Sequence, residues 1–210
     1  MVDAAKAYMR NRLILMVKEP VAGRVKTRLA REAGTAAALR FYRTVCANLI
    51  RRLGNDPRWQ PVLAVSPDSA VHSTSWPTSV ARIPQGIGDL GDRMGRLLRQ
   101  RGPRATIVIG SDIPDVRPAH IADAFRKLGS ADAVFGPAKD GGYWLVGMKP
   151  HRPALAIFRN VRWSSPHALD DTLANLEGHR IAFAATLGDV DDAASLGRIG
   201  HLGMRVTPVR

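Results

Sequence analysis

The sequence predicts an α/β fold in which a mainly parallel, Rossmann-like sheet lies between two layers of helices. Short apolar runs of strand length alternate along the chain with longer stretches in which apolar residues recur at helical spacing. This alternation is typical of strand–helix–strand units, whose helices cover both faces of a parallel sheet. The 210 residues, 45% of them hydrophobic, suit one domain over residues 1–210, with residues 1–11 as an N-terminal extension.

The apolar runs and the helical spacing predict the following elements in chain order. The first strand is the continuous apolar run Leu13 to Val17, which ends at a charged loop. A helical repeat then covers residues from about Thr27 to Leu53, and Gly54 and Pro57 stop it. Further strands are expected over 61–65, 106–109, 131–135, 143–148 and 181–185, and further helices over 89–101, 118–128 and 166–176.

Composition excludes several classes of protein. The longest apolar runs are far too short to span a bilayer, and the N-terminus lacks a secretory pattern. The single cysteine, Cys46, cannot form an internal disulfide, and its helical stretch favours a small buried side chain. We therefore expect a cytoplasmic protein with no membrane span.

The charge of the chain is strongly positive, +13 in total. The first 52 residues hold twelve Lys or Arg residues against three acidic ones, a local net of +9. Such a surplus attracts polyanions, so a basic nucleic-acid-binding module without catalysis is one alternative. With only 6% aromatic residues and no nucleic-acid-binding motif, the sequence argues against it, and simple solvation explains the surplus equally well.

The exit of the first strand is rich in cations. Lys18, Arg24, Lys26 and Arg28 fall within eleven residues, and the last two lie near an expected helix start. Backbone N–H groups at a helix N-terminus together with Lys and Arg form a phosphate cradle. We therefore expect Lys18, Gly23, Arg24 and Thr27 to bind substrate and Lys26 and Arg28 to act in catalysis. The loop is not a Walker P-loop, which requires glycine directly before Lys-Thr.

The exit of the strand at 106–109 carries a carboxylate, Asp112, within Ser111-Asp-Ile-Pro114. A carboxylate in this place is typical of sites that hold Mg²⁺ or Mn²⁺ together with substrate phosphates. The alternative is a capping role in a turn before the next helix. The scattered histidines show no zinc-ligand spacing, so the expected cofactor is Mg²⁺ or Mn²⁺ at Asp112.

Three further segments contribute candidates. Asp140, Gly141, Gly142 and Tyr143 combine a carboxylate, flexible glycines and a ring, which indicates either substrate contacts or a plain hairpin. Gly88, within the Gly-rich acidic stretch 86–94, is a further substrate-binding candidate. Asp191, in a run of carboxylates near the C-terminus, is either a second metal ligand or part of a helix cap.

Taken together, these motifs resemble a known family. The ordered set comprises Lys18 to Leu29, Gly88 to Met94, Gly110 to Pro114, Gly136 to Tyr143 and Asp189 to Asp191. It resembles the bacterial radical-SAM/selenodomain-associated, glycosyltransferase-like transferases of the nucleotide-diphospho-sugar transferase (GT-A) superfamily. That superfamily includes molybdenum-cofactor and phospholactate guanylyltransferases, and the resemblance covers nearly the whole chain after about residue 11.

The resemblance implies a GT-A type sheet and a role for each motif. Gly23, Arg24, Lys26 and Arg28 would bind donor phosphates, Asp112 would hold the metal, and Asp140 and Asp191 would line the site. The expected activity is a metal-dependent transfer from a nucleotide-sugar donor to an unknown acceptor. A nucleotidyltransferase that releases pyrophosphate is the alternative, because Asp112 stands alone where many sugar transferases have Asp-x-Asp.

Overall fold

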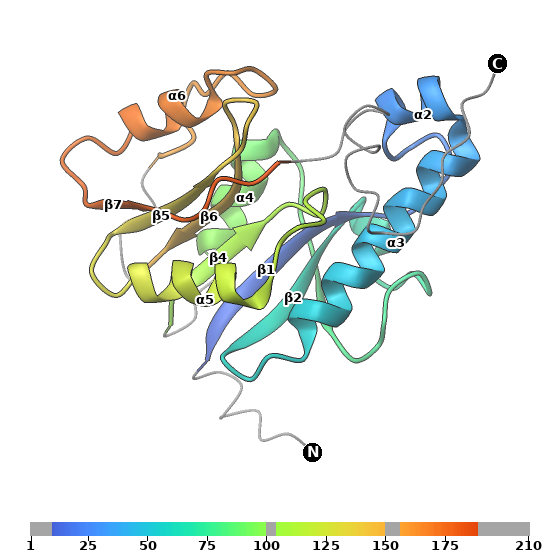
Figure 1. Ribbon diagram of the computed structural model, residues 1–210, viewed down its shortest axis with the longest axis horizontal. Coiled ribbons are helices and arrows are strands. Elements are labelled where there is room, and N and C mark those ends of the chain that lie inside the picture. The colour runs from blue at the N-terminus through green and yellow to red at the C-terminus, as the bar shows by residue number, and fades with distance from the viewer. Residues whose placement is uncertain (1–9, 100–103, 150–155, 189–210) are drawn as a thin grey trace.

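The computed structural model describes residues 10–99, 104–149 and 156–188, and its strands form one seven-stranded sheet (Figure 1). The strand order is β3-β2-β1-β4-β6-β5-β7. The strands are β1 (Asn11–Lys18), β2 (Trp59–Ser66), β3 (Ala81–Pro84), β4 (Thr106–Ile109), β5 (Ala133–Pro137), β6 (Tyr143–Met148) and β7 (Ile181–Phe183). Neighbouring strands are parallel except at β6, which is antiparallel to both β4 and β5.

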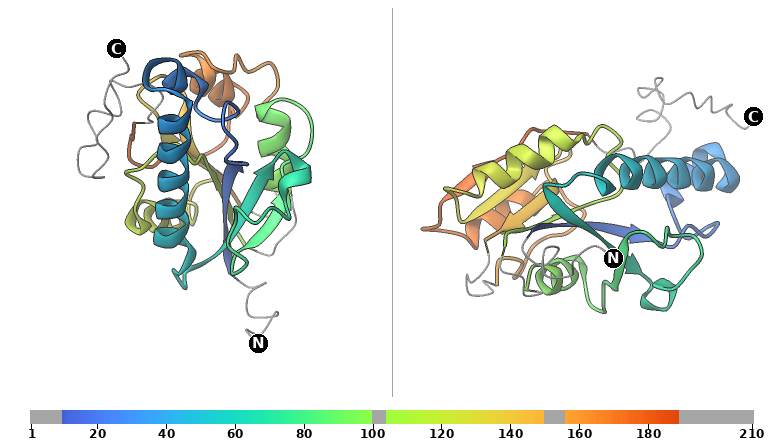
Figure 2. Two further views of the ribbon diagram at one scale, coloured as in Figure 1. Left: turned by 90° about the vertical axis from the view of Figure 1, so that its right-hand side faces the viewer. Right: turned by 90° about the horizontal axis from the view of Figure 1, so that it is seen from below.

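Helices cover both faces of this sheet (Figure 2). They are α2 (Thr27–Ala33), α3 (Thr35–Gly54), α4 (Leu90–Arg99), α5 (Pro118–Lys127) and α6 (Ala168–Ala174), and a short 3₁₀ turn spans Asp68–Ala70. Leu13 of β1 packs in one core with Phe41 of α3 and Ile121 of α5, whereas its neighbour Ile14 packs in a second core with Met94 of α4. Successive strand residues thus face opposite helical layers, which confirms the three-layer α/β prediction.

The long helix predicted over residues 27–53 is divided in two. Gly34 separates α2 from α3 with φ 84° and ψ 149°, a conformation that only glycine adopts without steric cost. Its N–H donates to the Ala30 carbonyl at 3.0 Å, so it also completes the end of α2. The apolar pattern of residues 27–53 gave no sign of this break, and Gly34 itself was the one signal of it in the sequence.

One strand of the sheet was not predicted. β3 is an edge strand of four residues with no fully buried side chain, so it left no apolar run in the sequence. β6 reverses direction because the turn after β5 joins the two strands as a hairpin, the alternative that the sequence offered for Asp140 to Tyr143. The predicted helix over 166–176 is shorter, from Ala168 to Ala174.

None of the helices in the described ranges combines the length and the apolar composition that crossing a bilayer demands.

Candidate functional site

A cleft of about 650 Å³ lies at the edge of the sheet where the parallel strands end. Lys18 at the end of β1, Gly110 to Asp112 after β4, and the turn between β5 and β6 all line it. In open α/β sheets ligands bind at this edge, outside the carboxyl ends of the strands. The volume lies within the range of small-molecule sites. This cleft is therefore the candidate functional site.

The cleft unites most of the residues singled out from the sequence. Those that line it are Lys18, Lys26, Gly88, Asp112, Asp140, Gly142 and Tyr143. Those that do not are Gly23, Arg24, Thr27, Arg28 and Gly141. Asp191, predicted as a second metal ligand, lies outside the described residues.

The loop after β1 brings one cation into the cleft and leaves the others at the surface. A turn closed by the Arg24 N–H to the Val21 carbonyl at 3.1 Å precedes the buried Val25, which anchors the loop. Lys26 follows in the left-handed conformation, with φ 48° and ψ 50°, directly before α2. A residue with a side chain pays about 1–2 kcal/mol for this conformation. Such costs are often found at functional sites, where the surrounding structure holds the strained residue.

Lys26 and Asp112 form an ion pair in the cleft. The Lys26 Nζ lies 3.2 Å from Asp112 Oδ2, and the Lys26 side chain is only 5% exposed, against 42% for Asp112. The other carboxylate oxygen, Oδ1, is covered from solvent and has no hydrogen-bond partner among the described residues. An uncompensated buried carboxylate oxygen is costly, because it has left water without gaining a donor. It marks Asp112 as a residue built to meet a further positively charged or donating group.

A buried tyrosine, Tyr42, contacts Lys18 at the end of β1 and Ser111 beside Asp112. The Tyr42 hydroxyl accepts the Lys18 N–H at 2.7 Å, donates to the Lys18 carbonyl at 3.1 Å and lies 3.5 Å from Ser111 Oγ. It therefore ties the end of β1 to the residue that precedes Asp112. Burial raises the pKa of the Tyr42 hydroxyl well above its usual value, so the group stays neutral and acts as a structural clamp.

Cys46 lies in the same buried region and contributes no nucleophile. Burial raises the pKa of its thiol to about 12, so the thiolate is negligible near pH 7. This agrees with the expectation of a small buried hydrophobic side chain.

The turn between β5 and β6 presents Asp140 to the cleft. Asp140 Oδ1 accepts the Gly142 N–H at 3.0 Å, which fixes the carboxylate at the tip of the hairpin. Gly141 has φ 85°, and a Cβ atom at this position would stand 2.2 Å from the Pro166 carbonyl oxygen. The glycine is thus required by the close approach of the segment before α6, rather than by a ligand.

Aromatic rings form one wall of the cleft. Tyr143 at the start of β6 packs edge-on against Phe135 at 5.3 Å and against Trp163 at 6.3 Å between ring centroids. The Tyr143 hydroxyl lies 3.4 Å from Thr172 Oγ1 on α6, and burial raises its pKa above the usual range. Trp163 also lines the cleft, and its indole N–H is buried without a partner among the described residues.

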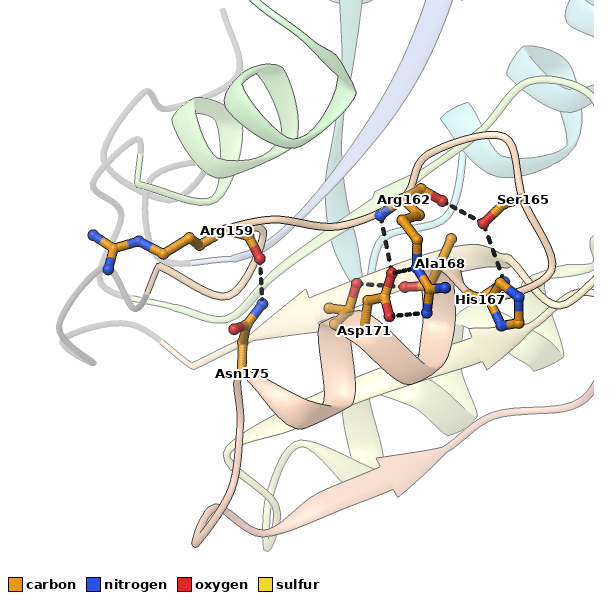
Figure 3. A network of polar contacts seen from close by, with 8 residues as sticks. Arg159, Arg162, Ser165, His167, Ala168, Asp171 and Asn175 are labelled. Carbon is orange, nitrogen blue, oxygen red and sulfur yellow. Dashed lines mark hydrogen bonds and ion pairs between the residues drawn. The ribbon is translucent and has the colours of Figure 1, made fainter.

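A polar network holds the segment that carries Trp163 (Figure 3). Arg162 binds both carboxylate oxygens of Asp171 on α6, with Nε at 2.9 Å and Nη2 at 2.8 Å. These contacts hold the pKa of Asp171 at about 2. Ser165, which lines the cleft, donates to the Arg162 carbonyl at 2.6 Å. The wall is therefore attached to α6 through this ion pair.

Sequence reasoning missed the contribution of the loop between β3 and α4 beyond Gly88. Asp89 and Arg93 both line the cleft, at the start of α4. Arg93 Nε donates to the Gly88 carbonyl at 3.0 Å, and the buried Gln85 Nε2 donates to the carbonyls of Val17 at 3.0 Å and of Ala64 at 2.8 Å. The sequence signal that could have identified them is the placement of Asp89 and Arg93 within the stretch Gly88 to Met94.

The residues present fit a divalent cation that is shared with a substrate. Among residues 10–99, 104–149 and 156–188, no three His, Cys, Asp or Glu side chains group together as a protein-only metal site. Mg²⁺ and Mn²⁺ do not need such a group, since one or two carboxylates plus substrate phosphates commonly bind them. Asp112, with one oxygen unpartnered, is the carboxylate that meets this description.

Comparisons with known proteins agree with this architecture. The model of a family of uncharacterised proteins conserved in bacteria (DUF2064) matches residues 49–165. A protein from Desulfovibrio desulfuricans G20, proposed to be a nucleotide-diphospho-sugar transferase, has a crystal structure that matches with a TM-score of 0.82. The two sequences are 24% identical, and the match covers 89% of this chain and 84% of that one. No curated protein matches the chain.

Two more distant structures share the fold together with bound ligands. A CMP:2-keto-3-deoxy-manno-octonic acid synthetase in complex with CTP is 13% identical, with a TM-score of 0.55, over 92% of this chain and 98% of that one. Rv0371c of Mycobacterium tuberculosis H37Rv in complex with manganese is 17% identical, with a TM-score of 0.51, and the match covers 91% of this chain and 98% of that one. At these identities the likeness establishes the nucleotide-diphospho-sugar transferase fold, whereas the narrower radical-SAM-associated family stays a prediction.

Proposed function

The chain belongs to a bacterial family of uncharacterised proteins (DUF2064), and from this premise we propose that it is a transferase that uses a nucleotide-activated donor and a divalent cation. The observation that carries the proposal is the Lys26–Asp112 pair at 3.2 Å in a cleft at the carboxyl edge of the sheet. A cation beside a carboxylate is the combination needed to hold a phosphate group and its metal ion together.

The favoured reaction is transfer of a sugar from a nucleotide-sugar. The bond between the anomeric carbon and the phosphate oxygen breaks, and the nucleoside diphosphate leaves with the bonding electrons. Lys26 and Lys18 bind the diphosphate and stabilise the negative charge that develops on it. Asp112 would hold the metal ion, which would supply further charge compensation for the same phosphates.

The acceptor side of the cleft has its own carboxylate. An acceptor hydroxyl that attacks the anomeric carbon loses its proton, and Asp140 is exposed at the cleft, where it can take that proton. Trp163 and Tyr143 give this side an aromatic wall of the kind that packs against sugar rings. Positioning and electrostatics account for the transfer without a covalent intermediate.

Nucleotidyl transfer is the second candidate, and one observation favours it. The metal-binding candidate is a single aspartate in Ser111-Asp112-Ile113-Pro114, without the Asp-x-Asp of many sugar transferases. In this reaction the acceptor attacks the α-phosphorus of a nucleoside triphosphate, and pyrophosphate leaves. The same lysines then offset the charge of the pyrophosphate. Support also comes from the fold shared with a synthetase that binds CTP.

One experiment tests the proposal and separates the two reactions. The protein is incubated with Mg²⁺ or Mn²⁺ and either nucleoside triphosphates or nucleotide-sugars, and the products are resolved by anion exchange. Nucleoside diphosphate from a nucleotide-sugar supports sugar transfer, and pyrophosphate from a triphosphate supports nucleotidyl transfer. Asp112→Asn should lower turnover at least about 100-fold. The control is Asp123→Asn on α5, whose carboxylate pairs with Lys127 and does not line the cleft. Full turnover in Asp112→Asn would remove the assignment.

A further inference from the structure

We propose that the cleft contains an apolar recess that binds the apolar body of the acceptor. The side chains of this recess, which all line the cleft, are Met16, Leu90, Met94, Tyr143 and Trp163. The acceptor is then an alcohol or a phenol with a ring or a short aliphatic chain, rather than a sugar or another polyol. This inference rests on the proposed function, because it names the class of molecule that the same cleft takes as its second substrate. Sugar transfer and nucleotidyl transfer both need such an acceptor.

The floor of the recess is the face of the sheet that α4 and α6 cover. Met16 belongs to β1, which lies between β2 and β4, yet it is only half-buried, whereas Leu15 and Val17 on either side of it are buried. Met16 points to the same face of the sheet as Ile14, two residues earlier, which packs in one core with Met94 of α4. The cleft therefore extends beside α4 to the apolar face of the sheet.

Trp163 forms one wall of the recess. A Cβ atom at Gly91, in the first turn of α4, would lie 2.8 Å from Cζ2 of the Trp163 ring. The same ring lies edge-on to Tyr143 of β6, with 6.3 Å between the ring centroids. Trp163 thus joins α4 to β6 and closes this side of the recess.

The polar atoms of the two rings do not face the recess. The Tyr143 hydroxyl lies 3.4 Å from Thr172 Oγ1, which itself donates to the Ala168 carbonyl at 2.7 Å. Tyr143 is therefore the donor in this pair, and its O–H points toward α6. The Trp163 N–H is covered from solvent. Both residues consequently present ring carbon atoms to a ligand.

The charged residues beside Leu90 are engaged in the start of α4. Asp89 Oδ1 accepts the Asp92 N–H at 2.8 Å, and Asp92 Oδ2 accepts the Asp89 N–H at 3.1 Å. Arg93 Nε donates to the Gly88 carbonyl at 3.0 Å. Leu90 has no polar group to engage, and its side chain, on a residue that is 45% exposed, is left as apolar surface in the cleft.

The aliphatic side chains decide which acceptor fits. A sugar or an inositol carries a hydroxyl on most of its carbons, and each hydroxyl that leaves water without gaining a hydrogen bond costs free energy. A ring or an aliphatic chain instead gains from burial against Met16 and Leu90. The rings of Tyr143 and Trp163 suit either molecule, so they do not discriminate. The reacting hydroxyl then lies toward Asp140, in the turn that leads into β6.

The first experiment titrates 4-fluorobenzyl alcohol, which has one ring and one hydroxyl, into the natural chain and follows its fluorine resonance. We expect a Kd of about 1–10 mM, which is typical of so small a ligand. Benzyl alcohol should displace the probe, and myo-inositol at the same concentration should not. Equal displacement by myo-inositol would identify a polyol site and would overturn the proposal.

Two isosteric substitutions locate the bound probe. Leu90→Asn should weaken its binding about fivefold, because an amide replaces apolar surface that contacts the ring. Ile87→Asn is the matched control, since Ile87 is 83% exposed, lies three residues away and does not line the cleft. It should change the affinity by less than about twofold, as is usual for surface substitutions. Equal effects of the two substitutions would place the probe outside the recess and refute the proposal.

A third measurement separates the acceptor from the donor. Nucleoside diphosphates with Mg²⁺, whose own binding is followed by thermal shift, should leave the affinity for 4-fluorobenzyl alcohol within about threefold. Displacement of the probe would mean that the recess holds part of the donor, and the acceptor assignment would fail.

The outcomes also distinguish this inference from the proposed function. If the nucleoside diphosphates do not bind the natural chain, the proposed function fails. If they bind and 4-fluorobenzyl alcohol does not, the acceptor inference fails alone. Leu90→Gln beside Ile87→Gln gives the same comparison if circular dichroism shows that Leu90→Asn disturbs α4.

Discussion

Gly141 offers a test of how closely the hairpin tip and the segment before α6 are packed. With φ 85°, an alanine at this position is in the left-handed region, which costs about 1–2 kcal/mol. Its Cβ would also meet three backbone atoms of Pro166, the carbonyl oxygen at 2.2 Å, Cα at 2.6 Å and the carbonyl carbon at 2.7 Å. Backbone atoms cannot rotate away as a flexible side chain can, so the whole segment has to move.

The two costs add to a large expected loss. Forcing an extra carbon into a filled site costs about 1–3 kcal/mol, so Gly141→Ala should lower the free energy of unfolding by about 2–5 kcal/mol in total. The displaced segment also carries the Leu169 N–H, which donates to the Gly141 carbonyl at 3.1 Å. For a chain of this size each kilocalorie per mole lowers the melting temperature by about 2–4 °C.

The assay is urea denaturation, followed by circular dichroism, of Gly141→Ala beside a matched glycine variant. Gly178 has φ 77° and nothing within 4 Å of a Cβ at its position, so Gly178→Ala bears the conformational cost alone. We expect it to lose about 1 kcal/mol, and the difference between the two variants to measure the contact with Pro166. If Gly141→Ala loses no more stability than Gly178→Ala, the close packing inferred for this turn is refuted.

Three further predictions concern groups around the cleft. The contacts with Arg162 lower the pKa of Asp171 to about 2. The contribution of this pair to stability is therefore present above about pH 4, the pKa of the unfolded state, and disappears as the pH falls toward 2. Melting curves of the natural chain and Asp171→Asn should differ at pH 6 and converge near pH 2. Cys46 should react with a thiol-specific disulfide reagent at pH 8 only after unfolding, because burial raises its pKa to about 12; fast labelling of the native protein would contradict this. Tyr42→Phe leaves the Lys18 N–H without its acceptor at 2.7 Å and should cost about 1–3 kcal/mol in urea denaturation, and a loss below about 0.5 kcal/mol would mean that the clamp is unimportant.

Local patterns were enough to identify most elements. β1 and β4 are buried on both faces, so each appears as an unbroken apolar run, and the interior of α3 buries Phe41, Val45 and Leu49 at helical spacing. The elements that were missed or altered depend on other forces. β3 is held by pairing to β2 rather than by burial, and the break at Gly34 reflects one backbone conformation rather than a change in hydrophobic pattern.

Part of the candidate site could also be predicted from the sequence. Strand exits in a parallel sheet converge on one edge, so Lys18 and Asp112 could be expected near each other from their positions alone. Arg24 and Arg28 belong to the same basic motif as Lys26, yet only Lys26 lines the cleft. Sequence distance along a loop does not specify which way each side chain points, because that depends on φ and ψ of each residue.

By itself, the sequence determined the α/β class, the strand exits that carry charge, and the buried character of Cys46. These are properties of periodicity and composition, which act locally and leave a direct record in the order of residues. Tertiary structure alone decided that β1 and β4 are neighbours and that Lys26 Nζ lies 3.2 Å from Asp112 Oδ2. It also decided that glycine is required at position 141 by the close approach of the Pro166 backbone rather than by a ligand. The physical reason is that these contacts join residues far apart in the chain, and strand order and the packing of loops set their distances.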